Sequence, residues 1–334
     1  MAKLLRVAML SKWHVHAAGY ANIVNNSGKA KVAAVWDDDI ARGISWAGEL
    51  KCEFMPDLDL LLARNDIDAV VCDAPTTAHK DIIIKAIKAG KHVFTEKALC
   101  PTVAECLEVK EALENSDVTF TISYPQRQRG AVQFAKAEIE KGTFGKVTFV
   151  RSRDAHSGVS GNWLPAYWFE EKDAAGGAMM DLGCHPMYLL AYLLGKPKRV
   201  TAIFNSPLGS KVDENAAATI EFANGAIGVA ETGFDSYKSP QMLEIYGTDA
   251  TLMYIGGEVR FCAKSIDGYT GGNFITPKLP ADKPLPLVQF IDACVNGTGS
   301  PEGLGIDDAI ALTELLELAY IQDKKVKKIA RKAK

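Results

Sequence analysis

Residues 68–97 read Asp68-Ala-Val-Val-Cys-Asp-Ala-Pro-Thr-Thr-Ala-His79-Lys-Asp-Ile-Ile-Ile-Lys-Ala-Ile-Lys-Ala89-Gly-Lys-His92-Val-Phe-Thr-Glu-Lys97. Two short apolar runs, 69–74 and 92–95, predict strands, and the segment 79–89 between them predicts a helix. Strands joined by a helix in this way form a parallel pair. Lys97 then lies at the carboxyl end of a strand, where open α/β sheets place their ligands.

The same alternation of strand and helix extends through the first part of the chain. Further strands are predicted at 4–10, 31–36 and 118–123, and a helix at 102–113 begins with a capping box formed by Thr102 and Glu105. Short apolar strands separated by helices predict a doubly wound parallel sheet of the Rossmann type. We assign this dinucleotide-binding domain to residues 1–123.

The pattern changes after residue 124. Asn224-Gly225 stands between two alternating runs and is the strongest short-range signal of a hairpin. Consecutive hairpins predict an α/β domain with a largely antiparallel open sheet over residues 124–284. Helical stretches beyond it predict a C-terminal segment, 285–334, that packs back on the first domain. The strands expected in the second domain are 146–153, 199–205, 216–222, 226–232, 242–246 and 259–263.

Length and composition limit the classes of function. A chain of 334 residues is too long for one typical core and predicts two domains. A net charge of −3 gives no reason to expect nucleic acid or an anionic membrane as a partner. The seven cysteines are scattered without a C-x-x-C pair, and no apolar run approaches the ~18 residues of a membrane helix. We therefore expect a cytoplasmic protein.

A second segment carries candidate catalytic groups. It reads Ala175-Gly-Gly-Ala-Met-Met-Asp181-Leu-Gly-Cys-His185, and its acid and imidazole are four residues apart at the start of a predicted helix. Residues at i and i+4 share a helix face. Lys97, Asp181 and His185 converging on one cleft would suit proton transfer to and from a carbinol oxygen. The alternative is a helix start where the dipole favours Asp181 and His185 is simply packed.

The first turn lacks the glycines of a dinucleotide site. Aligned by strand end, the pattern G-x-G-x-x-G would fall on Ser11, Trp13 and His16. Either the loop follows another path and holds phosphate through Ser11, Lys12 and helix N–H groups, or cofactor binding is weakened. His14 and His16 would share a face on a strand, but no matching cysteine or acid is nearby in the sequence. We therefore expect no metal site.

An acid follows the second predicted strand. Asp37 lies about twenty residues past the turn, where the ribose-binding acid of a dinucleotide site is expected. Asp38 or Asp39 could substitute for it, and a solvated loop acid is the alternative. A 2′-phosphate beside this carboxylate would suffer like-charge repulsion, and no arginine immediately follows. We expect NAD as the cofactor, with NADP not excluded.

These segments resemble the Gfo/Idh/MocA oxidoreductase family, which includes glucose–fructose oxidoreductase and inositol dehydrogenase. Residues 68–79 resemble the family's D-A-V-x-I-A-T-P-N-x-x-H, residues 89–98 its A-G-K-H-V-x-x-E-K-P, and residues 176–185 its G-G-x-x-x-D-x-G-x-H. Gly142-Thr-Phe-Gly145 resembles G-x-I-G, and Arg127 falls where the family often has an arginine. The resemblance covers most of the chain.

The resemblance implies NAD(P)-dependent oxidation or reduction of a sugar, cyclitol or similar polyol. It implies a homodimer or homotetramer, because the family's open sheet often forms the oligomer interface. By position, Lys97, Asp181 and His185 correspond to the family's catalytic residues, and Glu96 to a residue beside the cofactor's ribose. The full set expected around the cofactor is Ser11, Lys12, Trp13, His14, Asp37, Ala74, Pro75, Thr76, His79, Glu96 and Lys97.

The chain departs from the family's pattern at several positions. Thr76 replaces the usual asparagine, Ala98 replaces proline, and Tyr188 stands where many members have a second aspartate. Aromatic side chains before the catalytic segment could stack on a sugar's apolar face, or they could merely pack between domains. Arg153 or His156 could bind hydroxyls or a carboxylate. The residues expected around the substrate are Arg127, Arg153, His156, Trp163, Trp168 and Tyr188.

Three function classes remain open at this point. In the first, His185 is oriented by Asp181 and takes the hydroxyl proton during hydride transfer, while Lys97 hydrogen-bonds the same oxygen. In the second, a lyase or hydrolase uses transient oxidation on tightly held NAD. In the third, a non-catalytic sensor has kept the fold and lost productive cofactor binding, which the glycine-free turn would favour.

Overall fold

The chain divides into two compact units. The computed structural model describes residues 4–265 and 272–332. The first unit contains Met1–Tyr124 and Pro284–Thr313, and the second contains Pro125–Lys283 and Glu314–Lys334. The long helix α11 (Ile306–Lys332) thus contributes residues to both units. Our expectation that 285–334 packs as a whole on the first domain differs from this grouping. The second half of α11 bonds within the second unit, where Asp323 accepts from the N–H of Phe204.

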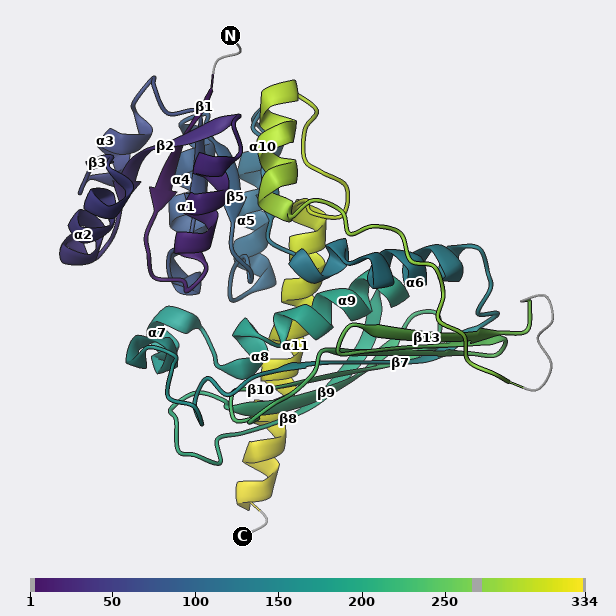
Figure 1. Cartoon of the computed structure of the whole chain (residues 1–334). Coiled ribbons are helices and arrows are strands. Elements are labelled where there is room, and N and C mark those ends of the chain that lie inside the picture. Colours follow the sequence, from purple (N-terminus) through teal and green to yellow (C-terminus); the bar gives the residue numbers. More distant parts are fainter. Residues whose placement is uncertain (1–3, 266–271, 333–334) are drawn as a thin grey trace. The chain divides into compact units, whose positions relative to one another are not determined.

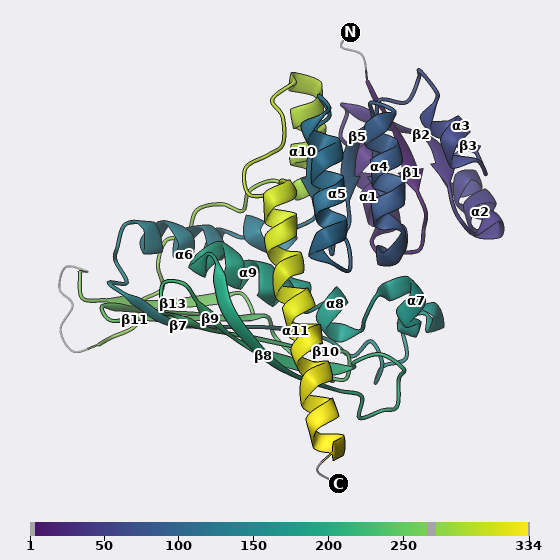
Figure 2. The same ribbon diagram turned by 180° about the vertical axis from the view of Figure 1, so that it is seen from behind.

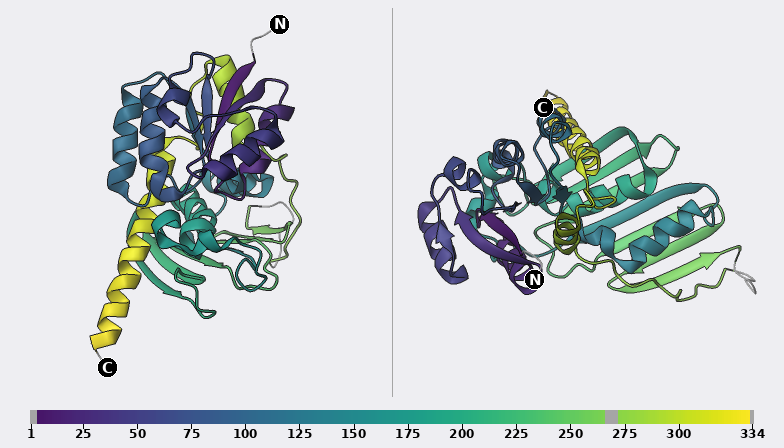
Figure 3. Two further views of the ribbon diagram at one scale, coloured as in Figure 1. Left: turned by 90° about the vertical axis from the view of Figure 1, so that its left-hand side faces the viewer. Right: turned by 90° about the horizontal axis from the view of Figure 1, so that it is seen from above.

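The first unit is a parallel six-stranded sheet with the order β3-β2-β1-β4-β5-β6. Helices α4 and α5 lie on one face, and α1 and α10 lie on the other (Figure 3). The strands are β1 (Leu5–Leu10), β2 (Ala30–Trp36), β3 (Glu53–Phe54), β4 (Ala69–Cys72), β5 (His92–Thr95) and β6 (Phe120–Ile122). The helices are α1 (Ala17–Asn26), α2 (Ile40–Leu50), α3 (Leu58–Leu62), α4 (His79–Lys88), α5 (Val103–Glu114) and α10 (Pro286–Asn296), with a short 3-10 turn at Thr76–Ala78.

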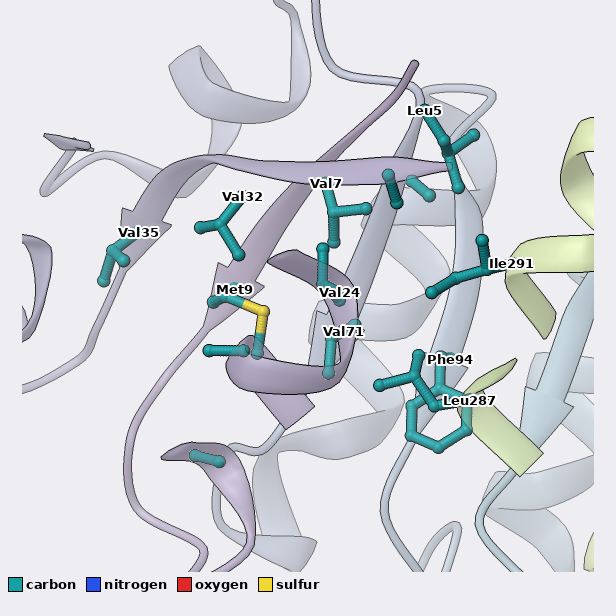
Figure 4. Packing of buried hydrophobic residues seen from close by; sticks show 14 of the residues in the cluster. Leu5, Val7, Met9, Val24, Val32, Val35, Val71, Phe94, Leu287 and Ile291 are labelled. Carbon is teal, nitrogen blue, oxygen red and sulfur yellow. The ribbon is translucent and has the colours of Figure 1, made fainter. Parts of the chain in front are cut away.

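Cover on both faces explains why these strands are apolar without alternation. Val7, Met9, Val71 and Phe94 have no exposed surface in the core shown in Figure 4, and Ile291 of α10 packs with them. The predicted doubly wound sheet is confirmed. The strand order reverses between β1 and β4, and such a switch point opens a crevice at the carboxyl ends of the strands. The two segments that follow β1 and β5 therefore approach a common edge.

The second unit is built on a seven-stranded sheet with the order β13-β12-β11-β7-β10-β9-β8. All neighbouring pairs are antiparallel except β7 and β10, which are parallel. Asn224-Gly225 joins β9 to β10 as predicted, with Gly225 at a φ of 85°. The strands are β7 (Val147–Ala155), β8 (Pro197–Asn205), β9 (Asn215–Phe222), β10 (Ile227–Gly233), β11 (Met242–Gly247), β12 (Ala250–Ile255) and β13 (Glu258–Ala263).

Helices cover one face of this sheet, as Figures 1 and 2 show. These helices are α6 (Gly130–Glu140), α8 (Ala178–Asp181) and α9 (Cys184–Leu194), and a short α7 (Glu171–Ala174) comes directly before α8 in the chain. Two 3-10 turns lie at Pro125–Gln128 and Ala166–Phe169. Along β8, Val200 and Phe204 are buried, whereas Ile203 between them is 69% exposed. The opposite face of the sheet therefore presents side chains outward.

Two further observations concern the sequence predictions. Strand β12 was missed because Thr-Leu-Met-Tyr-Ile places apolar residues on both faces, which hides the alternation.

Among the residues that the structure describes, no helix has both the length and the apolar character that crossing a bilayer requires.

Candidate functional site

The turn after β1 keeps a glycine-like backbone without glycine. Ser11 has a φ of 71°, the left-handed conformation that glycine adopts without steric cost. The N–H of Lys12 donates to Asp37 (2.8 Å), and the N–H of His14 donates to the carbonyl of Asp73 (3.0 Å). Trp13 is buried. Helix α1 then begins without a side-chain hydrogen bond at its N-cap. The N–H of Ala17 donates to the carbonyl of His14 (3.1 Å), and the N–H groups that follow it in the first turn can meet an anion.

The carboxylate of Asp37 is occupied by the chain itself. It accepts from Nε of Arg42 (2.9 Å) and from the N–H groups of Lys12 (2.8 Å) and Asp39 (3.0 Å). Burial alone would raise the pKa of Asp37, but the guanidinium and these N–H groups lower it overall. Asp38, whose side chain is half exposed, shares Arg42 at 2.8 Å. Its pKa is raised by burial and by Asp37.

This arrangement changes the prediction for the ribose-binding acid. We expected Asp37 to carry that role, with Asp38 or Asp39 as a substitute, and no arginine immediately follows it in the sequence. Arg42 is five residues on, and the first turn of α2 brings it back onto the carboxylate. Asp38 therefore has the more accessible carboxylate of the two.

His79 connects two loops at the carboxyl ends of β4 and β5. Its Nε2 lies 2.9 Å from the carbonyl oxygen of Ala74, and its Nδ1 lies 3.1 Å from those of Ala98 and Leu99. Burial lowers its pKa more than these carbonyls raise it. The ring is thus engaged in holding the backbone. The neighbouring predicted residues Pro75 and Thr76 form the turn that starts this connection.

Glu96 is the centre of a buried polar cluster. Its carboxylate contacts Nδ1 of His16 (2.8 Å) and accepts from the hydroxyl of Tyr20 and from the N–H of Lys97 (2.9 Å). Nε2 of His14 lies 3.8 Å away. Burial raises the pKa of Glu96, but His14 and His16 outweigh it and hold that pKa well below its usual range. Lys97 itself is 4% exposed.

Two residues beside Glu96, Tyr20 and Asp73, were not predicted from the sequence. Tyr20 bridges Glu96 to the hydroxyl of Ser123 (2.7 Å). Asp73 follows β4 as Glu96 follows β5, and its carboxylate is fully buried with no hydrogen-bond partner in the part of the chain that the structure describes. Burial, and then the charge of Glu96, raise the pKa of Asp73 well above its usual range. Asp73 and Glu96 each come directly after one of two neighbouring parallel strands, and this shared position could have identified Asp73 from the sequence.

In the second unit, Asp181 and His185 lie on two short helices instead of one. Helix α8 ends at Asp181, and α9 begins at Cys184 with Gly183 as its N-cap. The expectation of a single helix with both residues on one face is therefore wrong. Leu182 and Gly183 keep right-handed helical dihedrals, but the N–H of Gly183 donates to the carbonyl of Ala178 (2.7 Å), five residues back instead of four, and this shift interrupts the helix.

A buried acid fixes the start of α8. Asp213 accepts from the N–H groups of Gly177 (2.9 Å) and Met179 (2.8 Å) and from the hydroxyl of Tyr320 (2.7 Å). A Cβ on Gly177 would lie 2.0 Å from the carbonyl oxygen of Asp213, so only glycine fits there. We call Asp213, Tyr320 and Gly177 the α8 latch.

His185 is oriented by Tyr188. Its Nδ1 lies 2.8 Å from the Tyr188 hydroxyl, which accepts from the N–H of Gln126 (3.0 Å). Tyr188 is fully buried and was predicted to contact substrate; it supports the imidazole instead. Arg127, also predicted at the substrate, is buried and stacks on Tyr188 (5.6 Å) and on Tyr192 (4.9 Å). Its side chain is used to pack α9.

A pocket in the second unit is lined by His185 and Arg153. Arg153 is held by the hydroxyls of Ser239 (3.2 Å) and Ser236 (3.0 Å). The structure adds polar groups that sequence analysis did not select, because the alternation of β7 and β11 does not separate pocket from core. The pocket is lined by Gln126, Val132, Ser152, Arg153, Asp154, His185, Pro186, Leu189, Gln241, Met242, Leu243 and Tyr254.

The remaining predicted substrate residues do not line this pocket. His156 stacks on Phe234 at 5.1 Å and meets Trp163 at 4.7 Å. Trp168 is buried beside Tyr167. Of the substrate set, Arg153 lines the pocket with His185, and Tyr188 meets His185 from within the core. Lys97 belongs to the first unit, and Asp181 and His185 belong to the second.

Comparisons with known proteins match both units. Residues 15–124 match the model described as "Oxidoreductase family, NAD-binding Rossmann fold", and residues 132–253 match the "GFO/IDH/MocA C-terminal domain". A 2,7-anhydro-N-acetylneuraminate hydratase from Escherichia coli is 28% identical over 65% of this chain and 58% of the relative. A scyllo-inositol 2-dehydrogenase (NAD(+)) from Bacillus subtilis is 28% identical over 77% of this chain and 75% of the relative.

Solved structures share the fold. A levoglucosan dehydrogenase in complex with NADH and levoglucosan superposes with a TM-score of 0.83 over 97% of this chain and 98% of the other, at 20% identity. Among the curated relatives, a levoglucosan dehydrogenase from Pseudarthrobacter phenanthrenivorans is 27% identical over 57% of this chain and 55% of the relative. The alignments span little more than half of the length of that protein and of the hydratase.

Proposed function

The chain belongs to the Gfo/Idh/MocA oxidoreductase family, and from this premise we propose that it transfers a hydride between NAD and a carbinol of a sugar, cyclitol or related polyol. The observation that carries the proposal is the position of His185. Its ring lines a pocket with a guanidinium, amides and a carboxylate, while its Nδ1 is held by Tyr188. A proton-transfer group with one nitrogen fixed and the ring at a polar pocket suits chemistry at a hydroxyl.

The residues of the first unit fit a dinucleotide. The open N-terminus of α1 offers N–H groups to a pyrophosphate, and Ser11 gives the preceding turn the required left-handed backbone. Asp38 offers a half-exposed carboxylate to a ribose. When bound, NAD supplies or accepts the hydride at its nicotinamide ring. Asp38 together with the charged Asp37 disfavours a 2′-phosphate, which is why we propose NAD over NADP.

The proton path uses His185 and Tyr188. For oxidation, Nε2 of His185 takes the hydroxyl proton, and the hydroxyl of Tyr188 can accept from Nδ1 of the imidazolium that forms. For reduction, the same nitrogen returns the proton. Lys97 is proposed to hydrogen-bond the reacting oxygen, and Asp181 to position the substrate or the imidazole. Pairing of Nδ1 with a hydroxyl keeps the ring orientation in both protonation states.

Other features support the setting of this activity. All seven cysteines are free thiols, which supports a cytoplasmic location because disulfides are rare there. The outward face of the seven-stranded sheet exposes Ile203 (69%) and Ile227 (41%). We propose that this face forms the contact of a homodimer or homotetramer. The substrate is a small molecule, with neither a nucleic acid nor a membrane as partner.

A second candidate function has its own observation. One relative is named as a hydratase of an anhydro sugar, and another relative as a 1,5-anhydro-D-fructose reductase. An enzyme that eliminates or adds water through transient oxidation would keep NAD bound across the cycle. His185 would then move a proton to or from carbon or oxygen in the same pocket.

One experiment separates these functions. The purified protein is denatured, and the released nucleotide is identified by its mass and absorbance. A panel of sugars and cyclitols, anhydro sugars included, is then tested with added NAD. We expect NADH to accumulate with at least one polyol. Product without net NADH, together with retained nucleotide, would instead select the hydratase chemistry. Failure of NAD to bind at millimolar concentration would overturn both and favour a sensor.

A further inference from the structure

Two imidazoles and one carboxylate form a cluster at the carboxyl ends of the first sheet. His14 and His16 come from the turn after β1, and Glu96 is the residue after β5. One ligand atom from each of the three side chains lies within 4.8 Å of the others. Nδ1 of His16 is 2.8 Å from Oε1 of Glu96, and Nε2 of His14 is 3.8 Å from Oε2.

We propose that His14, His16 and Glu96 bind a divalent transition-metal ion, with zinc as the reference ion. Imidazole nitrogen and carboxylate oxygen are ligands that zinc takes together. Two histidines and one carboxylate also form the set that non-haem iron uses. Three protein ligands leave at least one position for water or another ligand, as in metal sites that are not purely structural. The site goes beyond the proposed function, because hydride transfer to NAD requires no metal.

The sequence places the two rings side by side. Only Val15 separates them along the chain. Their ring centroids are 4.6 Å apart, and the N–H of His16 lies 3.2 Å from Nδ1 of His14. Sequence analysis rejected a metal site because no acid was nearby along the chain. The acid is instead eighty residues away and arrives through the parallel sheet.

A second observation indicates that this region is built for a cation. The carboxylate of Asp73 is fully buried and has no hydrogen-bond partner among the described residues. It follows β4, which pairs with β5 up to Cys72 and Thr95, so Asp73 and Glu96 stand at adjacent strand ends. Buried carboxylates are costly unless a proton or a cation compensates them. A divalent ion at Glu96 would place two positive charges beside both.

The surroundings of Glu96 are those of an oriented ligand. Its two oxygens accept from the Tyr20 hydroxyl and from the N–H of Lys97, which fix the plane of the carboxylate. Such hydrogen bonds to the ligands help to set metal affinity. His14 is buried, whereas the side chain of His16 is 46% exposed, so the cluster opens to solvent on the His16 side.

The test uses untagged full-length protein that has been treated with EDTA and exchanged into a non-chelating buffer. Zinc chloride is titrated by calorimetry. We expect one zinc ion per chain. We expect His16→Ala to weaken zinc binding by ~10- to 100-fold or more, because loss of a residue that only hydrogen-bonds to a ligand already weakens metal binding by that range. Because His16 is half exposed, its replacement should leave the fold intact, which thermal melting checks. His156→Asn removes a histidine from the other unit and should bind like wild type.

Two further measurements keep the outcome decisive. Cobalt(II) replaces zinc as a spectroscopic probe, and its visible absorption should disappear in Glu96→Gln. No binding at millimolar zinc, or binding that His16→Ala and Glu96→Gln both leave unchanged, overturns the site. NADH binding is measured separately by fluorescence on the metal-free protein. NADH binding without zinc binding rejects only the metal site, and the reverse result rejects only the proposed cofactor.

Discussion

The turn Ser11–His16 and the segment Gly176–His185 differ in how their backbones are held in place. In the turn, the glycine pattern is gone, and the backbone is kept by a left-handed Ser11 and by hydrogen bonds to Asp37 and Asp73. In the second segment the glycines remain, and a buried acid from elsewhere, Asp213, accepts from the N–H groups of Gly177 and Met179. A turn can therefore adopt the left-handed backbone without a glycine, provided that polar groups distant in sequence hold it by hydrogen bonds.

The two regions also differ in the substitutions that they can tolerate. At Gly177 any Cβ would overlap the backbone of Asp213, so that segment has no freedom to change residue type. At position 11 the residue has changed while the conformation persists. The second unit should therefore respond to point changes in its catalytic segment far more strongly than the first unit does in its turn.

The largest effect is expected at His185. Replacement by asparagine removes the proton-transfer nitrogen, and turnover should fall ~100- to 10,000-fold, the usual contribution of a positioned acid–base group. Affinity for NADH should change little, because His185 lies in the second unit and the residues proposed to hold NAD lie in the first. Steady-state rates and NADH titration measure the two effects.

Two variants test the specificity of that loss. Tyr188→Phe removes the hydroxyl that holds Nδ1 and should lower turnover less than the loss of the ring itself. His156→Asn removes a ring that stacks outside the pocket and should retain most activity. If His185→Asn kept wild-type turnover on an identified substrate, the proposed proton path would be wrong.

The next effect concerns the α8 latch. Asp213→Ala leaves the N–H of Met179 without its side-chain acceptor, whereas the N–H of Gly177 keeps the hydroxyl of Tyr320 (3.1 Å). An unsatisfied buried N–H costs about 1–3 kcal/mol and the lost bond from Tyr320 about 1 kcal/mol, so the free energy of unfolding should fall by about 2–4 kcal/mol. Tyr320→Phe removes a hydroxyl that donates to Asp213 (2.7 Å) and accepts from Met180 (3.2 Å), but Asp213 keeps both N–H donors, and the variant should cost about 1 kcal/mol. Denaturant unfolding of both variants measures the difference, and equal losses would contradict the latch.

A smaller effect is expected in cofactor choice. Asp38→Asn removes the accessible carboxylate while Arg42 still pairs Asp37. Affinity for NAD should fall about tenfold, or about 1.4 kcal/mol, and the preference for NAD over NADP should narrow. Calorimetric titration with both nucleotides tests this. Glu49→Gln, an exposed acid on α2 that pairs with Lys12, is the matched control. If Asp38→Asn kept the wild-type preference for NAD over NADP, a residue other than Asp38 would bind the ribose.

Much of the fold was predictable because its signals are local. Unbroken apolar runs identified the parallel strands, and Asn224-Gly225 identified the hairpin. The candidate site was less predictable, because its partners come from distant segments. Arg42 on Asp37, Glu96 on His16 and Asp213 on Gly177 all depend on packing that no spacing reveals. The break between Asp181 and His185 was signalled by Gly183 alone, and an i to i+4 spacing concealed it.

The smallest effect tests His79, which we predicted beside the cofactor and which joins the loops after β4 and β5. Burial lowers its pKa below the ordinary value of 6.5, so the unfolded chain binds a proton that the folded chain resists. Stability should therefore be complete above about pH 6.5 and decline as the pH falls below it, by at most about 1.4 kcal/mol per pH unit. His79→Gln should be less stable at pH 8, because it loses the packed ring and the hydrogen bond that its single N–H donates to a loop carbonyl, yet it should lose less additional stability between pH 7 and 5. Thermal melts of both proteins across that window measure the slope. A wild-type slope retained in His79→Gln would assign the acid sensitivity to another group, whereas a slope that disappears would show that His79 serves the loops as a neutral ring.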